Sequence, residues 1–228
     1  LAQAAFNVTF LSAVTHAGVA VGTLVAIGCT PILTGLLARN VTTGWLAATG
    51  LALAGLVALL SEGLGHGVTV GGLAWALGAS ASYATFILAS AALATADLAM
   101  ESRLAAIFTV AAVLMSPALV LTSLAWVVSS AGVAMVTYMA TAATVLAYSL
   151  FNRGLRTVEP GTAATLGLTE PLVAAVLGVV VIGERLSTLS WLGAAIVLVA
   201  LVMMIRLSRP PRGAAVVAPG SRDGARQN

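Results

Sequence analysis

The sequence predicts an all-α membrane protein with about eight transmembrane helices. Of its 228 residues, 60% are hydrophobic and only 7% are charged, and the mean hydropathy is +1.08. A soluble domain has about 25% charged residues, so water is a poor solvent for most of this surface. The apolar residues form blocks of about 17 to 25, the length that a helix needs to cross a core of about 30 Å. The blocks are apolar on every face, which favours helices over the alternating strands of a membrane barrel.

Short polar or glycine-rich breaks divide the chain into successive spans. The chain starts inside an apolar block, with no basic segment or cleavage site before it, so we expect the first span to be truncated. The expected spans are Leu1–Val14, Gly18–Leu37, Gly44–Leu60, Gly71–Ala94, Leu104–Val128, Ala131–Phe151, Thr162–Ile182 and Leu189–Ile205. Residues 208–228 contain Pro210 and Pro211 but few apolar side chains, which predicts a disordered cytoplasmic tail.

The arginines predict the orientation of the spans, because cytoplasmic loops retain positive charge. If successive spans alternate in direction, Arg185 lies on one side of the membrane and all the other arginines lie on the opposite side. Those on the opposite side are Arg39, Arg103, Arg153, Arg156, Arg206, Arg209, Arg212, Arg222 and Arg226. We therefore expect a multi-pass protein of the inner or plasma membrane with a cytoplasmic C-terminus.

Two proline-containing spans indicate an internal repeat. Thr30-Pro31 and Thr169-Glu170-Pro171 each place a proline in the middle of a span. A span that starts with Trp-Leu follows each of them, at Trp45 and at Trp191. In the expected order the two copies are an odd number of spans apart, so they cross the membrane in opposite directions. This pattern is typical of the inverted repeats of transporters.

Five stretches near the C-terminus carry a resemblance to a known family. They are Ala147–Leu155, Glu159–Gly161, Leu168–Pro171, Gly183–Ser187 and Trp191–Ala194. In order and spacing they resemble the last three helices of the drug/metabolite transporter superfamily, in particular bacterial EamA-type permeases built from two inverted five-helix repeats. The start of the chain is similar to the end of the first repeat, although Arg39–Thr43 replaces the Gly-Glu-Arg turn seen at Gly183.

The resemblance implies a ten-helix architecture, of which eight helices would be visible in this chain. Residues 1–60 would then be the end of the first EamA-like repeat, with its third to fifth helices, and 61–207 the second repeat, with the sixth to tenth helices. The implied function is a secondary transporter that exports a small metabolite or drug by alternating access, commonly with proton coupling. Its expected partners are the lipid bilayer, a small-molecule substrate and protons.

Glu170 is the strongest candidate for a substrate-binding or ion-binding residue. It lies near the middle of the expected span Thr162–Ile182. A carboxylate at that depth costs roughly 2.5 to 3.5 kcal/mol on insertion scales, so it must face a cavity, be paired or be protonated. A site that exchanges a proton for substrate can use this property. The alternative is a carboxyl group that is hydrogen-bonded to a neighbouring helix and never meets substrate.

The other candidate binding residues surround the two proline motifs or lie within spans. Each proline removes a backbone donor, so Pro171 should leave the carbonyl of Gly167 free and bend its helix, and Pro31 should do the same in the first copy. A simple packing kink is the alternative. The full candidate set is Glu170, Pro171, Thr169, Pro31, Thr30, Tyr148 and Tyr83. Trp45 and Trp191 are expected to be interfacial anchors and are left out of it.

Rival functions find little support in the sequence. The stretch around Ser80 lacks the second glycine of a Gly-x-Ser-x-Gly nucleophile motif, and neither metal-ligand spacing nor a phosphate-binding loop occurs. We therefore expect no enzyme, no catalytic residue, no cofactor, no metal and no nucleic-acid partner. A channel would need a filter or a ring of charge. A non-transporting membrane scaffold stays open as an alternative, as do the substrate and the oligomeric state, a homodimer included.

Overall fold

The computed structural model describes residues 1–39, 41–64, 68–94, 99–120 and 122–208. Its helices are α1 (Ala2–Ala17), α2 (Val19–Leu37), α3 (Thr43–Leu59), α4 (Val70–Ala94), α5 (Met100–Met115), α6 (Pro117–Val120), α7 (Ser130–Tyr138), α8 (Ala147–Gly154), α9 (Pro160–Leu166), α10 (Thr169–Leu177) and α11 (Thr188–Leu207). Two π-helical segments, Met139–Leu146 and Gly178–Ile182, continue α7 and α10, and short 3₁₀ turns lie at Ser61–Gly63 and Ala125–Val128. The expected disordered tail lies outside the described residues beyond Ser208.

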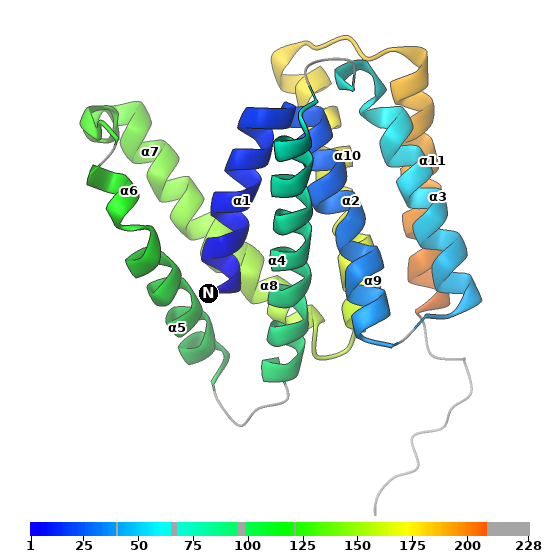
Figure 1. Ribbon diagram of the computed structural model, residues 1–228, viewed down its shortest axis with the longest axis horizontal. Helices are drawn as coiled ribbons and strands as arrows, with labels where there is room; N and C mark the ends of the chain where they lie inside the picture. Colours follow the sequence, from blue (N-terminus) through cyan, green and yellow to red (C-terminus); the bar gives the residue numbers. More distant parts are fainter. Residues whose placement is uncertain (40, 65–67, 95–98, 121, 209–228) are drawn as a thin grey trace, which may run out of the picture.

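The predicted fold class is confirmed. Within the described ranges the protein is helical, and six helical stretches are long and apolar enough to cross a membrane. They are Val19–Leu37, Val70–Ala94, Met100–Val120, Ser130–Gly154, Pro160–Ile182 and Thr188–Leu207, and α3 is a shorter apolar helix. Successive spans run in opposite directions along the bundle (Figure 1).

One expected span has different bounds. The span predicted at Leu104–Val128 is a helix from Met100 to Val120, followed by the 3₁₀ turn. Ser116 donates its backbone N–H to Val113 three residues back, and Pro117 has no N–H to give, so the helix is already distorted one turn before its end. The apolar composition continues past this point, and hydropathy alone therefore overestimated the span.

The sharpest connection joins α1 and α2 through one residue, Gly18. Gly18 has φ +80°, a left-handed conformation that glycine adopts without a Cβ penalty. The two helices are consequently antiparallel neighbours, and α1 also packs along α4 (Figure 1). This arrangement places the N-terminal turn of α1 against the middle of the bundle.

The two proline–tryptophan copies pack against each other. Helix α2 lies on α9, and α3 lies along α11 over most of its length. The α3–α11 contact is so close that a Cβ on Gly193 would lie 2.6 Å from the carbonyl oxygen of Gly55. Such backbone approach is the usual way in which membrane helices associate, because lipid tails are as apolar as the side chains.

Trp45 is buried, which corrects its expected role as an interfacial anchor. Only 6% of its surface is exposed, and its ring occupies the space that a Cβ on Gly35 would need. A Cβ on Gly161 would lie 3.3 Å from the indole Nε1. The first turn of α3 faces α2 and α9 at this level, so the indole fills a protein interface. Trp191 is 49% exposed, as the anchoring interpretation requires.

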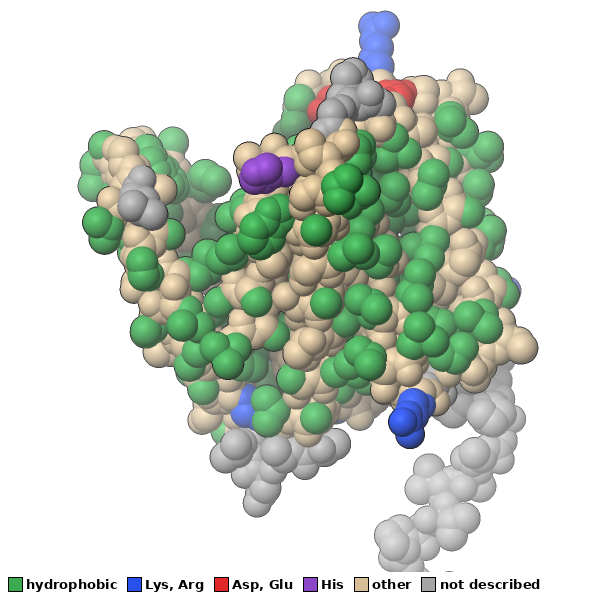
Figure 2. Space-filling model, viewed as in Figure 1, with side chains coloured by type: hydrophobic (Ala, Val, Ile, Leu, Met, Phe, Trp, Pro, Cys, Tyr) green, Lys and Arg blue, Asp and Glu red, His purple; other side chains and the backbone are tan. Residues whose placement is uncertain are grey.

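The outer surface matches a bilayer environment. Hydrophobic side chains cover the middle of the face in Figure 2, and the charged side chains seen there gather toward its two ends. The pair formed by Met100–Val120 and Ser130–Gly154 is covered least by the rest of the described chain. Apolar surface on this scale is expected where lipid is the solvent.

Candidate functional site

The span that contains Glu170 is interrupted at Gly167 and Leu168, directly before α10. Leu168 donates its N–H to Thr165 at 3.1 Å, and Glu170 donates its N–H to Gly167 at 3.0 Å, so shorter three-residue bonds replace the α-helical pattern. Pro171 explains this change, since it has no N–H and its ring crowds the carbonyl of Gly167. The predicted bend is present, but the carbonyl expected to be free accepts a hydrogen bond from Glu170.

Glu170 occupies the first turn of α10, near the middle of the span Pro160–Ile182. The Glu170 side chain is exposed at the protein surface, although protein atoms lie around much of its carboxyl group. No ion-pair partner for it exists among the described residues. The first turn of a helix stabilises negative charge by roughly 0.3 to 1 kcal/mol, because the peptide dipoles of the helix are aligned with their positive ends there. The carboxyl group therefore has a local reason to tolerate ionisation but no cation to hold it ionised.

The two candidate tyrosines lie near Glu170. Tyr83 of α4 and Tyr148 of α8 are partly buried and lie within electrostatic range of each other and of the Glu170 carboxyl group. Tyr83 is near the midpoint of Val70–Ala94, and Tyr148 follows directly after the π segment of its span. Three of the seven predicted residues, from three different spans, thus lie within electrostatic range of one another.

Gln3 of α1 completes this group and was missed from the sequence. Its Nε2 donates to the hydroxyl of Tyr148 at 3.2 Å. The residue is 6% exposed, and its Oε1 is buried without a hydrogen-bond partner. A buried amide oxygen with no donor costs about 1 to 3 kcal/mol, so the atom is ready to accept a hydrogen bond. An amide in an apolar block was the available signal, but the segment was interpreted only as an incomplete span.

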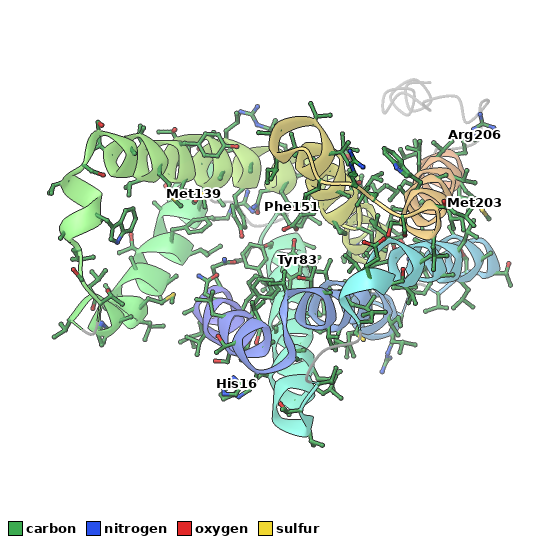
Figure 3. The ribbon with its side chains drawn as sticks, turned by 90° about the horizontal axis from the view of Figure 1, so that it is seen from above. His16, Tyr83, Met139, Phe151, Met203 and Arg206 are labelled. Atoms are coloured by element: carbon green, nitrogen blue, oxygen red, sulfur yellow. The ribbon has the colours of Figure 1, made fainter. Side chains whose placement is uncertain are left out.

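An aromatic network contacts the two phenols and contains every phenylalanine of the chain. Phe86 contacts Tyr148 edge to face at a centroid distance of 5.6 Å, and Phe6 lies 5.0 Å from Tyr83. Phe108 lies 4.8 Å from Tyr148. Figure 3 shows Tyr83 and Phe151 near each other in the middle of the molecule, seen along the helices. We call Gln3, Tyr83, Tyr148 and Glu170, with the phenylalanines Phe6, Phe86, Phe108 and Phe151, the polar–aromatic cluster.

The first proline motif does not join this cluster. The Thr30 hydroxyl donates to Ala26 at 2.7 Å and lies 3.3 Å from the hydroxyl of Ser80 on α4. Pro31 is fully buried, and α2 stays a single helix around it. Thr30 therefore lies in the α2–α4 contact, and no interaction joins it to Glu170 within the part of the chain that the structure describes.

The remaining two candidates belong to the helix break itself. Thr169 is exposed, and its hydroxyl donates to the carbonyl of Leu166 at 2.6 Å, which is a local bond within the turn. Pro171 is buried and forms the start of α10. Neither side chain points a free polar atom toward the cluster, so their part is to shape the backbone that holds Glu170.

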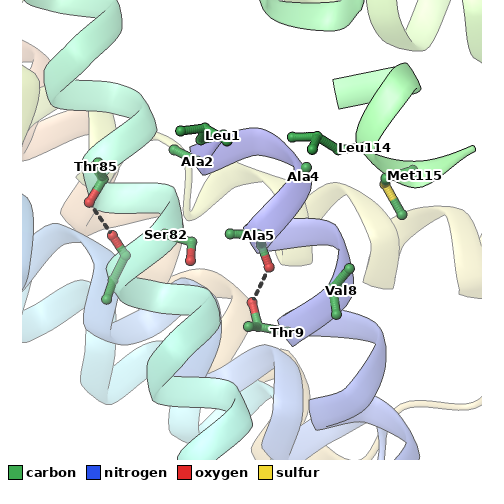
Figure 4. Close-up of a pocket in the computed structure, with 11 residues that line it drawn as sticks. Leu1, Ala2, Ala4, Ala5, Val8, Thr9, Ser82, Thr85, Leu114 and Met115 are labelled. Atoms are coloured by element: carbon green, nitrogen blue, oxygen red, sulfur yellow. Dashed lines mark hydrogen bonds between the residues drawn. The ribbon is translucent and has the colours of Figure 1, made fainter. Parts of the chain in front are cut away.

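A hollow of about 710 Å³ opens beside α1 but does not contain the cluster. It is lined by Leu1, Ala2, Ala4, Ala5, Val8, Thr9, Ala81, Ser82, Thr85, Leu114 and Met115. The hydroxyls of Thr9 and Thr85 donate to carbonyls of their own helices, those of Ala5 and Ala81 (Figure 4). No side chain of this lining is charged, and its hydroxyls, those of Thr9, Ser82 and Thr85, donate to carbonyls of their own helices, so it is a largely apolar recess suited to contact with lipid or another helix.

Metal binding finds no support in the described residues. They contain no group of three or more His, Cys, Asp or Glu side chains that could hold an ion. His66 lies outside the described ranges. The chemical groups available at the cluster are therefore one carboxyl group, two phenols, one amide and a set of aromatic rings.

Comparisons with known proteins agree with this architecture. The model of the EamA-like transporter family matches residues 70–206. An uncharacterized transporter of Bacillus subtilis (strain 168), YwfM, is 38% identical over 215 residues, which cover 92% of this chain and 71% of the relative. A solved crystal structure with 20% sequence identity superposes with a TM-score of 0.75, over 91% of this chain and 73% of that one, and indicates the same fold.

Proposed function

Because the chain belongs to the EamA-like transporter family, we propose that it exports a small metabolite or drug as a proton-coupled secondary transporter. Membership in this family and the name of the relative support a membrane transporter in general. The finer proposal is that Glu170 carries the coupling proton and that the polar–aromatic cluster binds the solute. The two oppositely directed proline-containing copies support alternating access, in which they would rock against each other around a central site.

The observation that carries the proposal is the accessible, unpaired carboxyl group of Glu170 in mid-span. A permanently ionised group there would cost roughly 2.5 to 3.5 kcal/mol, and a permanently protonated one would gain nothing from the first turn of α10. A group that alternates between the two states fits both constraints. The phenols of Tyr83 and Tyr148 lie within electrostatic range of it.

The orientation that we propose has the C-terminus in the cytoplasm. Arg39 follows α2, Arg103 lies in α5, Arg153 lies in α8 and Arg206 lies in the last turn of α11. The corresponding helix ends are at one end of the bundle in Figure 1. Positive charge retained on that side supports the proposed direction.

The Glu170→Gln variant tests the coupling role. The protein would be reconstituted in vesicles that contain a pH-sensitive dye, and amino acids, sugars and nucleobases would be added one at a time under a pH gradient. Wild type should move protons with at least one solute, and the variant should lose this solute-dependent proton movement. The amide keeps the size of the side chain but cannot exchange a proton.

Glu184→Gln is the matched control, since Glu184 is an exposed carboxylate at the end of the same span. It should leave the flux unchanged. Equal pH-dependent flux in wild type and Glu170→Gln would contradict the coupling role. If wild type moved none of the solutes, the result would favour the hypothesis that the chain is a non-transporting membrane scaffold.

A further inference from the structure

The polar groups of the cluster share one chemical character, since they offer acceptors and no cation. Glu170 provides a carboxyl group without an ion-pair partner among the described residues. The amide of Gln3 donates one N–H to Tyr148, and its Oε1 has no hydrogen-bond partner. Among the described residues, the groups that act electrostatically on the two phenols are Glu170, Gln3 and the neighbouring phenol, and none of them is a cation. A ligand that brings its own donors and positive charge would satisfy these groups.

The aromatic rings favour the same kind of ligand. Tyr148 makes edge-to-face contacts with Phe86 and with Phe108, so three aromatic rings lie together beside the hydroxyl that Gln3 contacts. An aromatic face attracts a cation within about 6 Å, by about 0.5 to 2 kcal/mol depending on solvation. Packing alone would explain the rings, but it would not explain a buried amide oxygen without a donor beside them.

We infer that the cluster binds protonated amines, with the ammonium group between Glu170 and the Gln3 Oε1 and the organic part against the aromatic rings. This inference rests on the proposed transport function and names its substrate class. It gives Gln3 a separate task from Glu170: the carboxylate recognises charge, whereas the amide oxygen recognises an N–H donor. A quaternary ammonium ion has the charge but no N–H, so it separates the two tasks.

Binding to the purified full chain in detergent or nanodiscs, measured by calorimetry, provides the test. The probes are phenethylammonium, its quaternary trimethyl derivative, phenethyl alcohol and phenylacetate, which share one ring and differ in charge and donors. Phenethylammonium should bind about tenfold or more tightly than the alcohol, since hydrogen bonds to charged groups are worth about 1.5 to 3 kcal/mol. Phenylacetate should bind most weakly.

Three variants test which residue recognises the positive charge and which recognises the N–H donor. Gln3→Leu should weaken phenethylammonium about tenfold and leave the quaternary ion nearly unchanged, whereas Glu170→Gln should weaken both cations. Gln3→Glu, which keeps an acceptor oxygen, should restore binding of phenethylammonium. Thermal unfolding of each variant would show whether Gln3→Leu folds. If it does not, Gln3→Glu still tests the role of the acceptor oxygen.

Three results would overturn the inference: no binding of phenethylammonium at millimolar concentration, equal affinity for the alcohol, or an equal loss for both cations in Gln3→Leu. The last result would mean that Gln3 only holds Tyr148 in place. Failure of the proposed function looks different, because amine binding could persist while no solute-linked proton movement occurs. Conversely, proton-coupled flux of solutes without any affinity for amines would leave transport intact and remove this substrate class.

Discussion

Replacing Gly193 with leucine should break the contact between α3 and α11 and destabilise the protein by several kcal/mol. Gly193 is buried, and a Cβ at this position would lie 2.6 Å from the carbonyl oxygen of Gly55 and 2.8 Å from the carbonyl carbon of Ala58. These neighbours are backbone atoms of α3, which cannot rotate away. Overpacking typically costs about 1 to 3 kcal/mol, and more when backbones must separate. The free energy of unfolding in mixed micelles would be measured by SDS titration.

The same helix pair contains a matched control. Gly50 lies on the exposed face of α3, and nothing lies within 4 Å of a Cβ placed there. Gly50→Leu should be neutral or stabilising by up to about 1 kcal/mol, because leucine favours the helix more than glycine does. Similar unfolding free energies for Gly193→Leu and Gly50→Leu would show that α3 and α11 do not approach at this glycine.

The second large effect is expected for Trp45→Ala. The Trp45 ring is 6% exposed and fills the contact of α3 with Gly35 of α2 and Gly161 of α9. Removal of a buried aromatic side chain costs about 3 to 5 kcal/mol, since the surrounding atoms lose contacts and close the space only in part. The loss should appear as a lower midpoint in thermal unfolding followed by size-exclusion chromatography.

Two further tryptophan variants separate packing from other causes. Trp191→Ala should cost less than about 1 kcal/mol, because a half-exposed ring has fewer protein contacts to lose. The loss of stability in Trp45→Phe should lie between those of Trp45→Ala and Trp191→Ala. Phenylalanine keeps most of the ring, and the substitution removes an indole N–H that is buried without a partner. If Trp45→Ala and Trp191→Ala were equally mild, Trp45 would be an interfacial anchor after all.

Part of the site followed from local sequence. A carboxylate beside a proline in an apolar block predicts both a helix break and an expensive charge, and these two expectations drew attention to Glu170. The break occurs at Gly167 and Leu168, directly before α10. The first copy behaves differently, because Thr30 satisfies its hydroxyl on Ala26 and Ser80 and Pro31 stays within a continuous α2. The two proline motifs thus have different surroundings.

The aromatic partners could not be assigned in advance. The sequence does not fix the surroundings of Tyr83 and Tyr148, because an aromatic residue within a span can face lipid, protein or a ligand with the same local sequence. The π segment Met139–Leu146 changes the helical repeat just before Tyr148, so a regular period of 3.6 residues would place that ring on the wrong face.

Length, composition and span-sized blocks were enough to derive the all-α membrane class and the order of the helices. These properties follow from the thickness of the bilayer and from the need to pair every backbone group inside it. The grouping of Gln3 with Tyr148, the burial of Trp45 and the α3–α11 contact came from tertiary packing. In a membrane, lipid-facing and protein-facing surfaces are both apolar, so hydropathy carries no information about which faces meet.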